Sequence, residues 1–410
     1  MASRIVILAD DLSGAADCAA ACHRAGLKTK VCLNCEALGL PADALALDLD
    51  SRALPPAEAW ALTLAARTLI GPTLAGKPAL YRKIDSTLRG HVALDIAATL
   101  EIAGPGAFAV VCPAYPATGR TVREGQVYVG GQRLEDTEIW RLSGRGSTDL
   151  GVLLAGAGLK PVGLGLDVVR GPGLRQAIEA ARAAGARAAV CDAETESDLE
   201  AVVAATLSLP GVVWAGSGGL TIPLAQGLSP IGEPAATPVV RRAGPTLVAV
   251  GSASSVSRGQ LALLAKDARV QTFTVSPRVL IEGPEGPGWR PASRGIVAAV
   301  GRAGKDTVAV AIDPAAPVDP AAGPALASAF GVLVGRQLGR FGALVVTGGE
   351  TARAILSTAG VQVLCIRREI EPGVVLSMAG ALPVVTKAGA FGAPQSLARA
   401  VDILRSLALA

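Results

Sequence analysis

Short, unbroken apolar runs alternate with alanine-rich amphipathic segments along most of the chain. The first run, RIVILA at residues 4–9, has the length of a buried parallel strand, and residues 14–26 predict a helix that ends at Gly26. Further strand-length runs are TKVCL, ALALDL, AFAVVCP, ARAAVCDA and GVVWAG, and PPAEAWALTLAARTLI has the prolines favoured at a helix start. Repetition of strand and helix predicts a doubly wound α/β domain.

This rhythm breaks at residues 228–245, LSPIGEPAATPVVRRAGP, where proline, glycine and paired arginine replace the periodic pattern. A second series of strand–turn–helix segments follows. We therefore expect two doubly wound α/β domains with a cleft between them, at residues 1–230 and 246–410, joined by a linker at 231–245. Inside the first domain, VYVGGQRL predicts a hairpin insertion with a Gly-Gly turn.

Composition agrees with two aliphatic cores. Hydrophobic residues make up 50% of the 410 positions, which argues against disorder. Aromatic residues are only 3%, so the cores must be built from aliphatic side chains. A net charge of +4 without a run of Lys or Arg gives no support to nucleic-acid or membrane-surface binding. The start, MASRIVILADD, lacks the features of a secretory signal, and no apolar run is long enough to span a membrane, so we expect a cytoplasmic protein.

Four of the seven cysteines lie close together in the sequence. Cys18 and Cys22 are one helical turn apart, and Cys32 and Cys35 form a CxxC pair. A zinc site built from these four is one interpretation. Because the pairs fall in a predicted helix and strand rather than on turns, we favour buried thiols in a reducing compartment.

Polar side chains gather where the predicted strands of the first domain end, which is where open α/β sheets bind ligands. Arg and Lys bind carboxylates, while Asp and Ser bind hydroxyl groups, so these side chains together predict a pocket for a small hydroxylated anion. The clusters are Asp10, Asp11 and Asp17; Asp48, Asp50, Ser51 and Arg52; Lys83, Asp85, Ser86, Thr87 and Arg89; and Tyr115, Arg120 and Arg123.

Single members of these clusters also have structural interpretations. Asp11 or Ser13 could cap the first helix, Arg52 could be a surface charge, and Asp85 with Arg89 could be an ordinary i,i+4 ion pair. Lys83 is harder to treat in this way, because lysine is scarce in the chain. We also expect Arg89 and the glycine after it to open a helix whose N-terminus adds positive potential for a carboxylate or a phosphoryl group.

The strands of the second domain end in Gly- and Ser-rich loops instead. These are GSASS at 251–255, TGGET at 347–351 and KAGAFG at 387–392. Backbone N–H groups at such turns bind phosphates, so three of them in one domain predict a nucleotide site, although each one also fits an ordinary βα turn. The P-loop pattern GxxxxGK[ST] does not occur in the sequence.

The chain resembles the four-carbon acid sugar kinase family, formerly a family of unknown function. The matching segments run in family order over nearly the whole chain and are ADDLSGAAD, DSR, KIDSTLRG, PAYPATGRTVREGQVYV, AGSGGL, GSASSVSRGQ, VTGGETA and KAGAFG. The resemblance implies an ATP-dependent kinase that converts threonate, erythronate or 3-oxo-tetronate to a 4-phosphate. It also implies that the first domain binds the sugar acid and the second binds ATP.

Carried over motif by motif, the resemblance implies ATP contacts from Ser252 or Ser254, Gly348, Gly349, Glu350, Thr351, Gly389 and Gly392. The family often has Asp where this chain has Glu350, which leaves open whether Glu350 binds metal, ribose or only its own helix. It also often has Thr at position 13 and Asn at position 390, where this chain has Ser and Ala. ADDLSGAAD differs from the DDFTGATD common in 3-oxo-tetronate kinases, which favours threonate or erythronate.

The expected mechanism uses Mg²⁺ and loop amides to hold the phosphates of ATP, while an Asp accepts the proton of the terminal hydroxyl group. Asp11 and Asp85 are the candidates for that base, and the sequence does not choose between them. Metal ligands stay unassigned. The substrate-binding candidates are Asp10, Asp17, Ser51, Arg52, Lys83, Ser86, Arg89, Tyr115 and Arg120.

Three other functions remain open at this point. The first is a 3-oxo-tetronate 4-kinase of the same family. The second is a non-catalytic two-lobed sugar-acid-binding protein, which would leave the phosphate-type loops unexplained. The third is a phosphatase or phosphotransferase built on LADDLSG, a segment that lacks the Asp-x-Asp spacing of haloacid dehalogenases. The expected partners are a sugar acid and ATP, and a homodimer stays open.

Overall fold

The structure is a computed structural model that describes residues 4–33, 41–143, 146–229, 239–252, 254–313, 315–316 and 322–409. Its contacts divide the chain into two compact units. The first contains the described residues of Met1–Thr29 and Leu38–Pro234, and the second contains those of Lys30–Ala37 and Ala235–Ala410. Both units are α/β, so the predicted α/β class is confirmed for each. Most of the expected linker lies outside the described residues.

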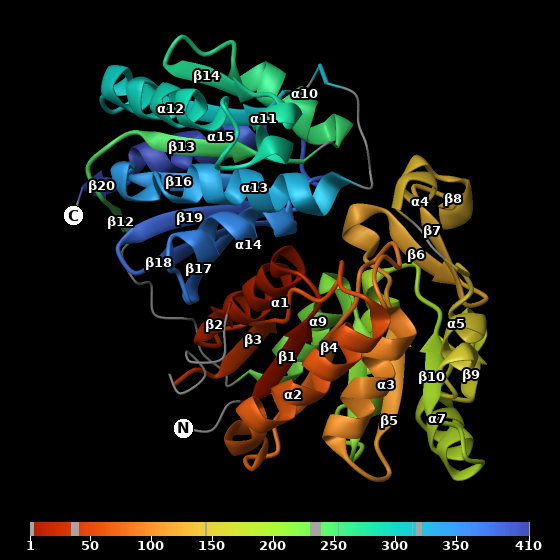
Figure 1. The fold of residues 1–410 in the computed structure, drawn as a ribbon. Helices are drawn as coiled ribbons and strands as arrows, with labels where there is room; N and C mark the ends of the chain where they lie inside the picture. The colour runs from red at the N-terminus through yellow and green to blue at the C-terminus, as the bar shows by residue number, and fades with distance from the viewer. Residues whose placement is uncertain are drawn as a thin grey trace. The chain divides into compact units, whose positions relative to one another are not determined.

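Parallel strands form the main sheet of the first unit (Figure 1). Every residue of its first strand is buried, as expected for a parallel sheet that is covered on both faces. In order across the sheet the strands are β3 (Ala44–Asp48), β1 (Ile5–Ala9), β4 (Ala79–Lys83), β11 (Val212–Gly216), β5 (Phe108–Cys112), β10 (Ala188–Cys191) and β9 (Pro161–Leu164).

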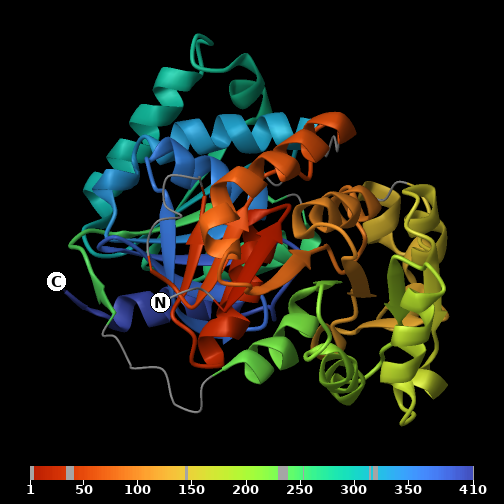
Figure 2. The same ribbon diagram turned by 90° about the horizontal axis from the view of Figure 1, so that it is seen from below.

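Helices cover both faces of this sheet (Figures 1 and 2). Side chains alternate along β4, so that Lys83 reaches α1 while Arg82 reaches α3 on the opposite face. On the α1 face lie α1 (Leu12–Arg24), α8 (Glu196–Thr206) and α9 (Gly218–Leu228). On the α3 face lie α2 (Pro56–Leu74), α3 (Val92–Ala103) and α5 (Leu150–Gly156). The other helical elements of this unit are η2 (Pro116–Thr118), η3 (Leu134–Asp136), α4 (Glu138–Ser143), α6 (Leu166–Val169) and α7 (Leu174–Ala183).

The predicted hairpin insertion follows β5. It is a small antiparallel sheet of β6 (Arg120–Arg123), β7 (Gln126–Val129) and β8 (Gln132–Arg133). Gly130 and Gly131 have φ values of 58° and 82°, which is the left-handed backbone of a type I′ turn. The predicted Gly-Gly turn is therefore confirmed.

The second unit has a mixed sheet, parallel on one side and antiparallel on the other. Its parallel strands, in order, are β14 (Val270–Val275), β15 (Thr307–Ile312), β13 (Thr246–Val250), β16 (Ala343–Thr347) and β19 (Leu382–Lys387). The antiparallel strands that follow are β18 (Val374–Ala379), β17 (Val363–Glu371) and β2 (Thr29–Cys32).

Strand β2 comes from the amino-terminal part of the chain. Lys30, Val31 and Cys32 pair with β17, which is why residues 30–33 group with the second unit. The division expected from the sequence did not include this exchange. A four-residue strand carries no sequence signal for the sheet that it joins.

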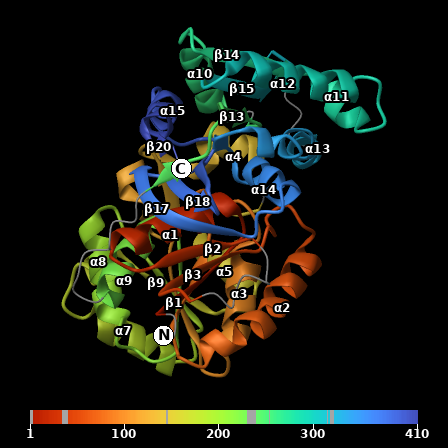
Figure 3. The same cartoon turned by 90° about the vertical axis from the view of Figure 1, so that its left-hand side faces the viewer.

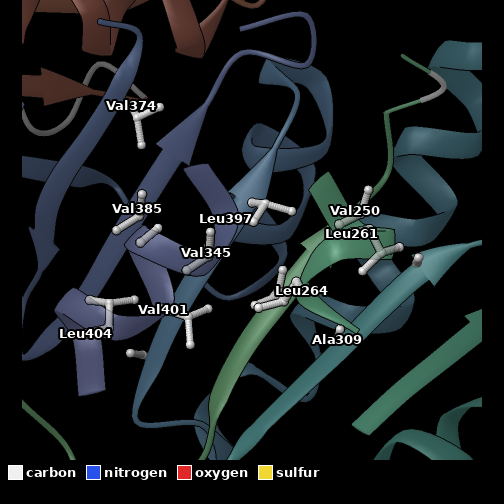
Figure 4. Close-up of a cluster of buried hydrophobic side chains, with 14 of the residues drawn as sticks. Val250, Leu261, Leu264, Ala309, Val345, Val374, Val385, Leu397, Val401 and Leu404 are labelled. Carbon is white, nitrogen blue, oxygen red and sulfur yellow. The ribbon is translucent and has the colours of Figure 1, made fainter. Parts of the chain in front are cut away.

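Helices also cover both faces of the second sheet. In Figure 3, α10 (Ser255–Leu264) and α15 (Ser396–Ser406) lie on one side of β13, with α13 (Gly323–Gly335) and α14 (Gly349–Thr358) on the other. Figure 4 shows the aliphatic core under α10 and α15, where Leu261, Leu264 and Leu397 pack against strand residues such as Val345 and Val385. The remaining elements are α11 (Pro277–Glu282), α12 (Trp289–Ala303), η5 (Leu338–Arg340), β12 (Val240–Arg241) and β20 (Ala408–Leu409).

None of the helices in the described parts of the chain is both long and apolar enough to cross a membrane.

Candidate functional site

The candidate sugar-acid site lies at the carboxyl edge of the first unit's sheet. Register places Ala9 opposite both Asp48 and Lys83, and Lys83 opposite Gly216, so these strands end at one level. The chain passes from β1 to β3 on one side and then crosses to β4 on the other. Ligands bind at such a reversal in doubly wound sheets, because the two flanking loops diverge there.

Arg52 joins the two carboxylates that follow β1. Its Nε donates to Asp10 Oδ2 at 2.7 Å, and its Nη2 donates to Asp10 Oδ1 and to Asp11 Oδ1, both at 2.9 Å. The loop before Arg52 is fixed as well, because the N–H groups of Ser51 and Arg52 donate to the Asp10 carbonyl. Arg52 is therefore not the surface charge that a structural interpretation of the sequence would make it.

Asp11 has two roles here. Its Oδ1 also accepts the N–H of Gly14 at 3.0 Å, so it caps α1 and starts that helix at Leu12 rather than at the predicted residue 14. Its Oδ2 has no hydrogen-bond partner among the described residues. One carboxylate oxygen of Asp11 is thus fixed and the other remains available.

Two glycines let these charged groups approach the backbone. A Cβ on Gly14 would lie 2.8 Å from both Asp11 Oδ1 and Lys83 Nζ, and a Cβ on Gly90 would lie 2.9 Å from Asp10 Oδ2. Lys83 is 5% exposed, and its ammonium donates to the Ile84 carbonyl at 3.0 Å. Neither glycine was predicted to have this role, although Gly14 follows the Asp pair closely enough to suggest a tight turn.

Asp85 and Arg89 form the ion pair that was the structural alternative. Arg89 Nε donates to Asp85 Oδ2 at 2.5 Å and Nη2 to Oδ1 at 3.0 Å, while Thr87 Oγ1 donates to Oδ2 at 2.6 Å. Both oxygens of Asp85 are therefore occupied. The residues Arg89 and Gly90 do not open a helix, because Leu88 and Gly90 have positive φ and α3 begins only at Val92.

The charges of this cluster support one another. Burial raises the pKa of Asp85, but the guanidinium groups of Arg89 and Arg52 outweigh it and hold the pKa well below its ordinary value. Burial also raises the pKa of Asp10, and Arg52, with help from Lys83 and Arg82, again reverses the shift. Both carboxylates therefore stay ionised at neutral pH.

Tyr115 and Arg120 are held together at the end of η2. Their backbones exchange two hydrogen bonds, Tyr115 N to Arg120 O at 2.8 Å and Arg120 N to Tyr115 O at 3.1 Å. Burial lowers the pKa of Arg120, and the charge of Asp85 only partly opposes the shift. Arg120 is 9% exposed, so it joins Lys83 as a buried cation of this unit.

Asp17, Ser51 and Ser86 complete the predicted set. Asp17 belongs to α1, and its carboxylate reaches the start of α9. A Cβ on Gly218 there would overlap this carboxylate and come within 3.1 Å of the Tyr115 ring. Ser51 is fully buried, and its Oγ has no hydrogen-bond partner among the described residues. Ser86 is buried in the loop after β4.

Two contacts near the site were not predicted. Tyr81 donates its hydroxyl to the Ser217 carbonyl at 2.5 Å, which ties β4 to the start of α9. Arg82 is wholly buried, and its Nη2 lies 2.7 Å from Asp95 Oδ2 of α3. Tyr81 and Arg82 both lie in β4, and nothing in the sequence of that strand indicates the partner of either side chain.

In the second unit, the three Gly/Ser loops meet at the carboxyl edge of its sheet. Register places Val250 opposite Thr347, and Thr347 opposite Lys387. Each loop therefore begins beside the next one. The Gly348 N–H also donates to the Lys387 carbonyl at 2.8 Å, which joins the second loop to the third.

Glycine allows these loops to touch. A Cβ on Gly251 would overlap the Thr351 hydroxyl and lie 2.8 Å from its Cγ2, and a Cβ on Gly389 would overlap the Ser252 hydroxyl. Ser252 Oγ accepts the Ser254 N–H at 3.2 Å. These contacts place Ser252, Ser254, Thr351 and Gly389 in one cluster.

The start of α14 is suited to an anion. Gly348 is its N-cap with φ 90°, and its cap has no side-chain hydrogen bond. The first turn of α14 includes Gly349 and Thr351. The first N–H groups of a helix point out of its end without an intrahelical acceptor, and such an end is suited to binding a phosphate. Gly392 also has positive φ, and a Cβ there would lie 2.9 Å from Glu371 Oε1.

No group of three or more His, Cys, Asp and Glu side chains in the described ranges could hold a metal ion. Cys18 and Cys22 are buried in α1 and Cys32 is buried in β2, while Cys35 lies outside the described residues. Burial raises the pKa of the Cys18 thiol to about 12, which keeps it protonated. This agrees with the buried-thiol interpretation.

Comparison with known proteins identifies the class of both units. A family model described as a sugar-binding N-terminal domain matches residues 5–224, and one described as a nucleotide-binding C-terminal domain matches residues 247–397. The chain belongs to the four-carbon acid sugar kinase family, so it is related to kinases over both units. The predicted resemblance is confirmed.

Its relatives include several kinases of four-carbon acids. A D-threonate kinase of Cupriavidus necator is 44% identical over 96% of each chain, and one of Bordetella bronchiseptica is 34% identical over 98% of this chain and 97% of its own. A solved Salmonella typhimurium LT2 structure covers 98% of this chain and 99% of its own, with TM-score 0.78 and 21% identity. At that identity the likeness shows a shared fold alone.

Proposed function

We propose that the protein transfers the γ-phosphoryl group of ATP to the terminal 4-hydroxyl group of D-threonate. The observation that carries the proposal is the Arg52 bridge between Asp10 and Asp11, at the carboxyl edge of a unit that matches a sugar-binding domain. The 44% identity with a D-threonate kinase supports the choice of acid.

In this proposal the cations of the first unit bind the carboxylate of the acid. Lys83 suits this role, because its buried ammonium donates to one backbone carbonyl and has further N–H groups for the carboxylate of the acid. Arg120 is supported by its burial and by the favourable charge interaction with Asp85. Arg89 already donates two hydrogen bonds to Asp85, so it would attract the acid through its charge more than through hydrogen bonds. Asp10, Asp17, Ser51, Ser86 and Tyr115 are left for the hydroxyl groups.

Asp11 is the better candidate for the base. Its Oδ2 has no hydrogen-bond partner among the described residues, whereas both oxygens of Asp85 accept hydrogen bonds. A base needs an oxygen within reach of the proton that it accepts. We therefore assign proton acceptance to Asp11 and the ordering of the 85–89 loop to Asp85.

The second unit supplies the nucleotide site in this proposal. The N–H groups that open α14 and the loops around Ser252 and Gly389 would hold the phosphates. Mg²⁺, when bound with ATP, would neutralise phosphate charge. It usually keeps waters and takes one or two carboxylates besides the phosphates, so the lack of a three-residue ligand cluster in the described ranges does not conflict with it.

The test is an activity screen. The purified protein is incubated with ATP, Mg²⁺ and, separately, D-threonate, D-erythronate and 3-oxo-tetronate, and ADP release is followed. We expect the highest kcat/KM with D-threonate and a phosphorylated C4 in the product. Preference for another of these acids would correct the substrate, and no ADP release with any of them would refute the kinase proposal.

A further inference from the structure

Lys387 ends β19 at the candidate nucleotide loop, and its side chain turns back into that loop. The residue is 1% exposed. Its Nζ lies 2.9 Å from the carbonyl oxygen of Ala388, 3.0 Å from that of Phe391, 3.3 Å from that of Gly389 and 3.3 Å from Ser257 Oγ. An ammonium group has three N–H donors, so loop carbonyls can satisfy it fully.

This arrangement fixes the direction of the neighbouring N–H groups. In a planar trans peptide, a carbonyl and the N–H of the next residue point in opposite directions. The described part of the chain contains no cis peptide. When the carbonyls of residues 388, 389 and 391 turn toward Lys387, the N–H groups of Gly389, Ala390 and Gly392 must turn away from it.

These three N–H groups have no hydrogen-bond acceptor among the described residues, and Ala390 and Gly392 are exposed. Successive outward N–H groups beside a glycine with positive φ are typical of backbone sites that bind anions. A positive charge behind the loop adds to the attraction.

We infer that Lys387 is a positioning residue for nucleotide binding, which holds the carbonyls of the 387–392 loop inward so that its N–H groups face a phosphate of ATP. This inference rests on the proposed function, because it takes the loop to be part of the ATP site. It assigns to Lys387 no direct contact with ATP.

The surroundings of Lys387 make the interaction sensitive to pH. Glu371 of β17 is the charged group that acts on it, and Arg399 of α15 pairs with Glu371 at 2.5 Å. Helix α10 contributes the Ser257 hydroxyl, and β16 ends beside Lys387 at Thr347. Burial lowers the pKa of Lys387 to about 8, and Glu371 opposes this shift only in part.

The consequence can be measured on the unmodified protein. Loss of the proton removes one donor and the charge, so the loop should hold its carbonyls less firmly and the affinity for ATP should fall as the pH rises through about 8. The second pKa of a phosphate group is about 6, so the charge of ATP changes little as the pH rises through about 8.

The experiment is equilibrium titration with ATP alone, from about pH 7 to about pH 9.5, on the wild type, Lys387→Met and Lys266→Met. Lys266 is exposed in the same unit and serves as the matched control. At neutral pH we expect Lys387→Met to weaken ATP binding by about 10- to 100-fold, as for a lost charged hydrogen bond. Its affinity should not vary with pH, and the wild type should approach it at the alkaline end.

Kinetics separate positioning from general damage. KM for ATP should rise in Lys387→Met, while KM for the sugar acid changes little. Ser257→Ala is a milder second variant, because it removes the hydroxyl that donates to the Gly389 carbonyl at 2.8 Å, and it should weaken ATP binding by about 2- to 10-fold. If Lys387→Met does not fold, Ser257→Ala and the wild-type pH series decide the question.

The two possible failures differ. A wild type that binds no ATP would overturn the proposed function. A wild type that binds ATP equally across the pH range, with Ser257→Ala or a folded Lys387→Met binding as tightly, would overturn the role of Lys387 alone.

Discussion

Arg52 and Asp10 form two parallel hydrogen bonds, Nε to Oδ2 at 2.7 Å and Nη2 to Oδ1 at 2.9 Å, although they lie 42 residues apart in the chain. A planar guanidinium fixes both the distance and the orientation of a carboxylate that it binds in this way. Since the same Nη2 donates to Asp11, one side chain sets the positions of two neighbouring carboxylates.

The first prediction replaces this arginine by lysine. Arg52→Lys keeps the charge but cannot make the paired hydrogen bonds, so Asp11 should lose its fixed position. We expect kcat with D-threonate to fall by about 10- to 100-fold, while the affinity for ATP by titration stays near the wild-type value.

Arg123→Lys is the matched control for this prediction, because Arg123 pairs with Glu194 at the surface of the same unit. Equal losses of kcat in the two variants would contradict a special role for Arg52.

The second prediction separates the two candidate bases. Asp11→Asn keeps the helix cap but removes the basic oxygen, so kcat should fall by roughly 10²- to 10⁴-fold with a smaller change in KM for the acid. Asp85→Asn instead weakens the hydrogen bonds from Arg89 and Thr87, so it should raise KM for the acid and lower Tm. Steady-state kinetics and thermal unfolding of both variants test this assignment. If Asp85→Asn lost kcat while Asp11→Asn stayed active, Asp85 would be the base and Asp11 would have the structural role.

The third prediction concerns the contact between two loops of the second unit. A Cβ on Gly251 would overlap the Thr351 hydroxyl, so Gly251→Ala should push the first turn of α14 away from the GSASS loop. ATP affinity should fall by about 10-fold or more. Gly259→Ala is the control, since nothing lies within 4 Å of a Cβ there.

The control should change the stability of the protein rather than its affinity for ATP. Gly259 lies inside α10, where alanine is favoured over glycine by about 1 kcal/mol, so Gly259→Ala should raise the free energy of unfolding and leave ATP binding unchanged. Unchanged ATP affinity in Gly251→Ala would show that the contact between the loops does not shape the nucleotide site.

Much of the fold could be predicted because its signals are local. The strand-length runs, the Gly-Gly turn at Gly130 and the polar residues at strand ends each depend on a few adjacent residues. The register of parallel strands then brings separate clusters together, as with Asp10 and Lys83, without any further sequence signal. The resemblance to a known family supplied the order of these segments.

Other features depend on partners that are distant in the sequence. The helix expected from Arg89 begins at Val92, because the backbone conformation of Leu88 is set by the Asp85 loop rather than by helix propensity. Strand β2 joins the second unit through pairing with β17, which no pattern within β2 indicates. Arg52 donates to Asp10 and Asp11, which lie 42 and 41 residues away, so these hydrogen bonds have no local sequence signal.

Arg82 and Asp95 form a buried ion pair that the sequence did not predict, and the last prediction concerns this pair. The pair lies on the α3 face of β4, with Nη2 and Oδ2 2.7 Å apart. Arg82 Nε and Nη1 and Asp95 Oδ1 have no hydrogen-bond partner among the described residues. Burial raises the pKa of Asp95 even though the charge of Arg82 opposes it. Such a pair contributes little to stability compared with apolar side chains of the same size.

Arg82 nevertheless helps to lower the pKa of Asp10, so we expect it to serve the site rather than the core. Arg82→Met alone leaves a buried carboxylate without a partner and should lower the free energy of unfolding by roughly 3–5 kcal/mol. The double variant Arg82→Met/Asp95→Leu should recover most of that loss in denaturant unfolding. Its kcat with D-threonate should nevertheless stay below that of the wild type, because Asp10 loses a supporting charge. A double variant with both stability and kcat restored would show that the pair acts in packing alone.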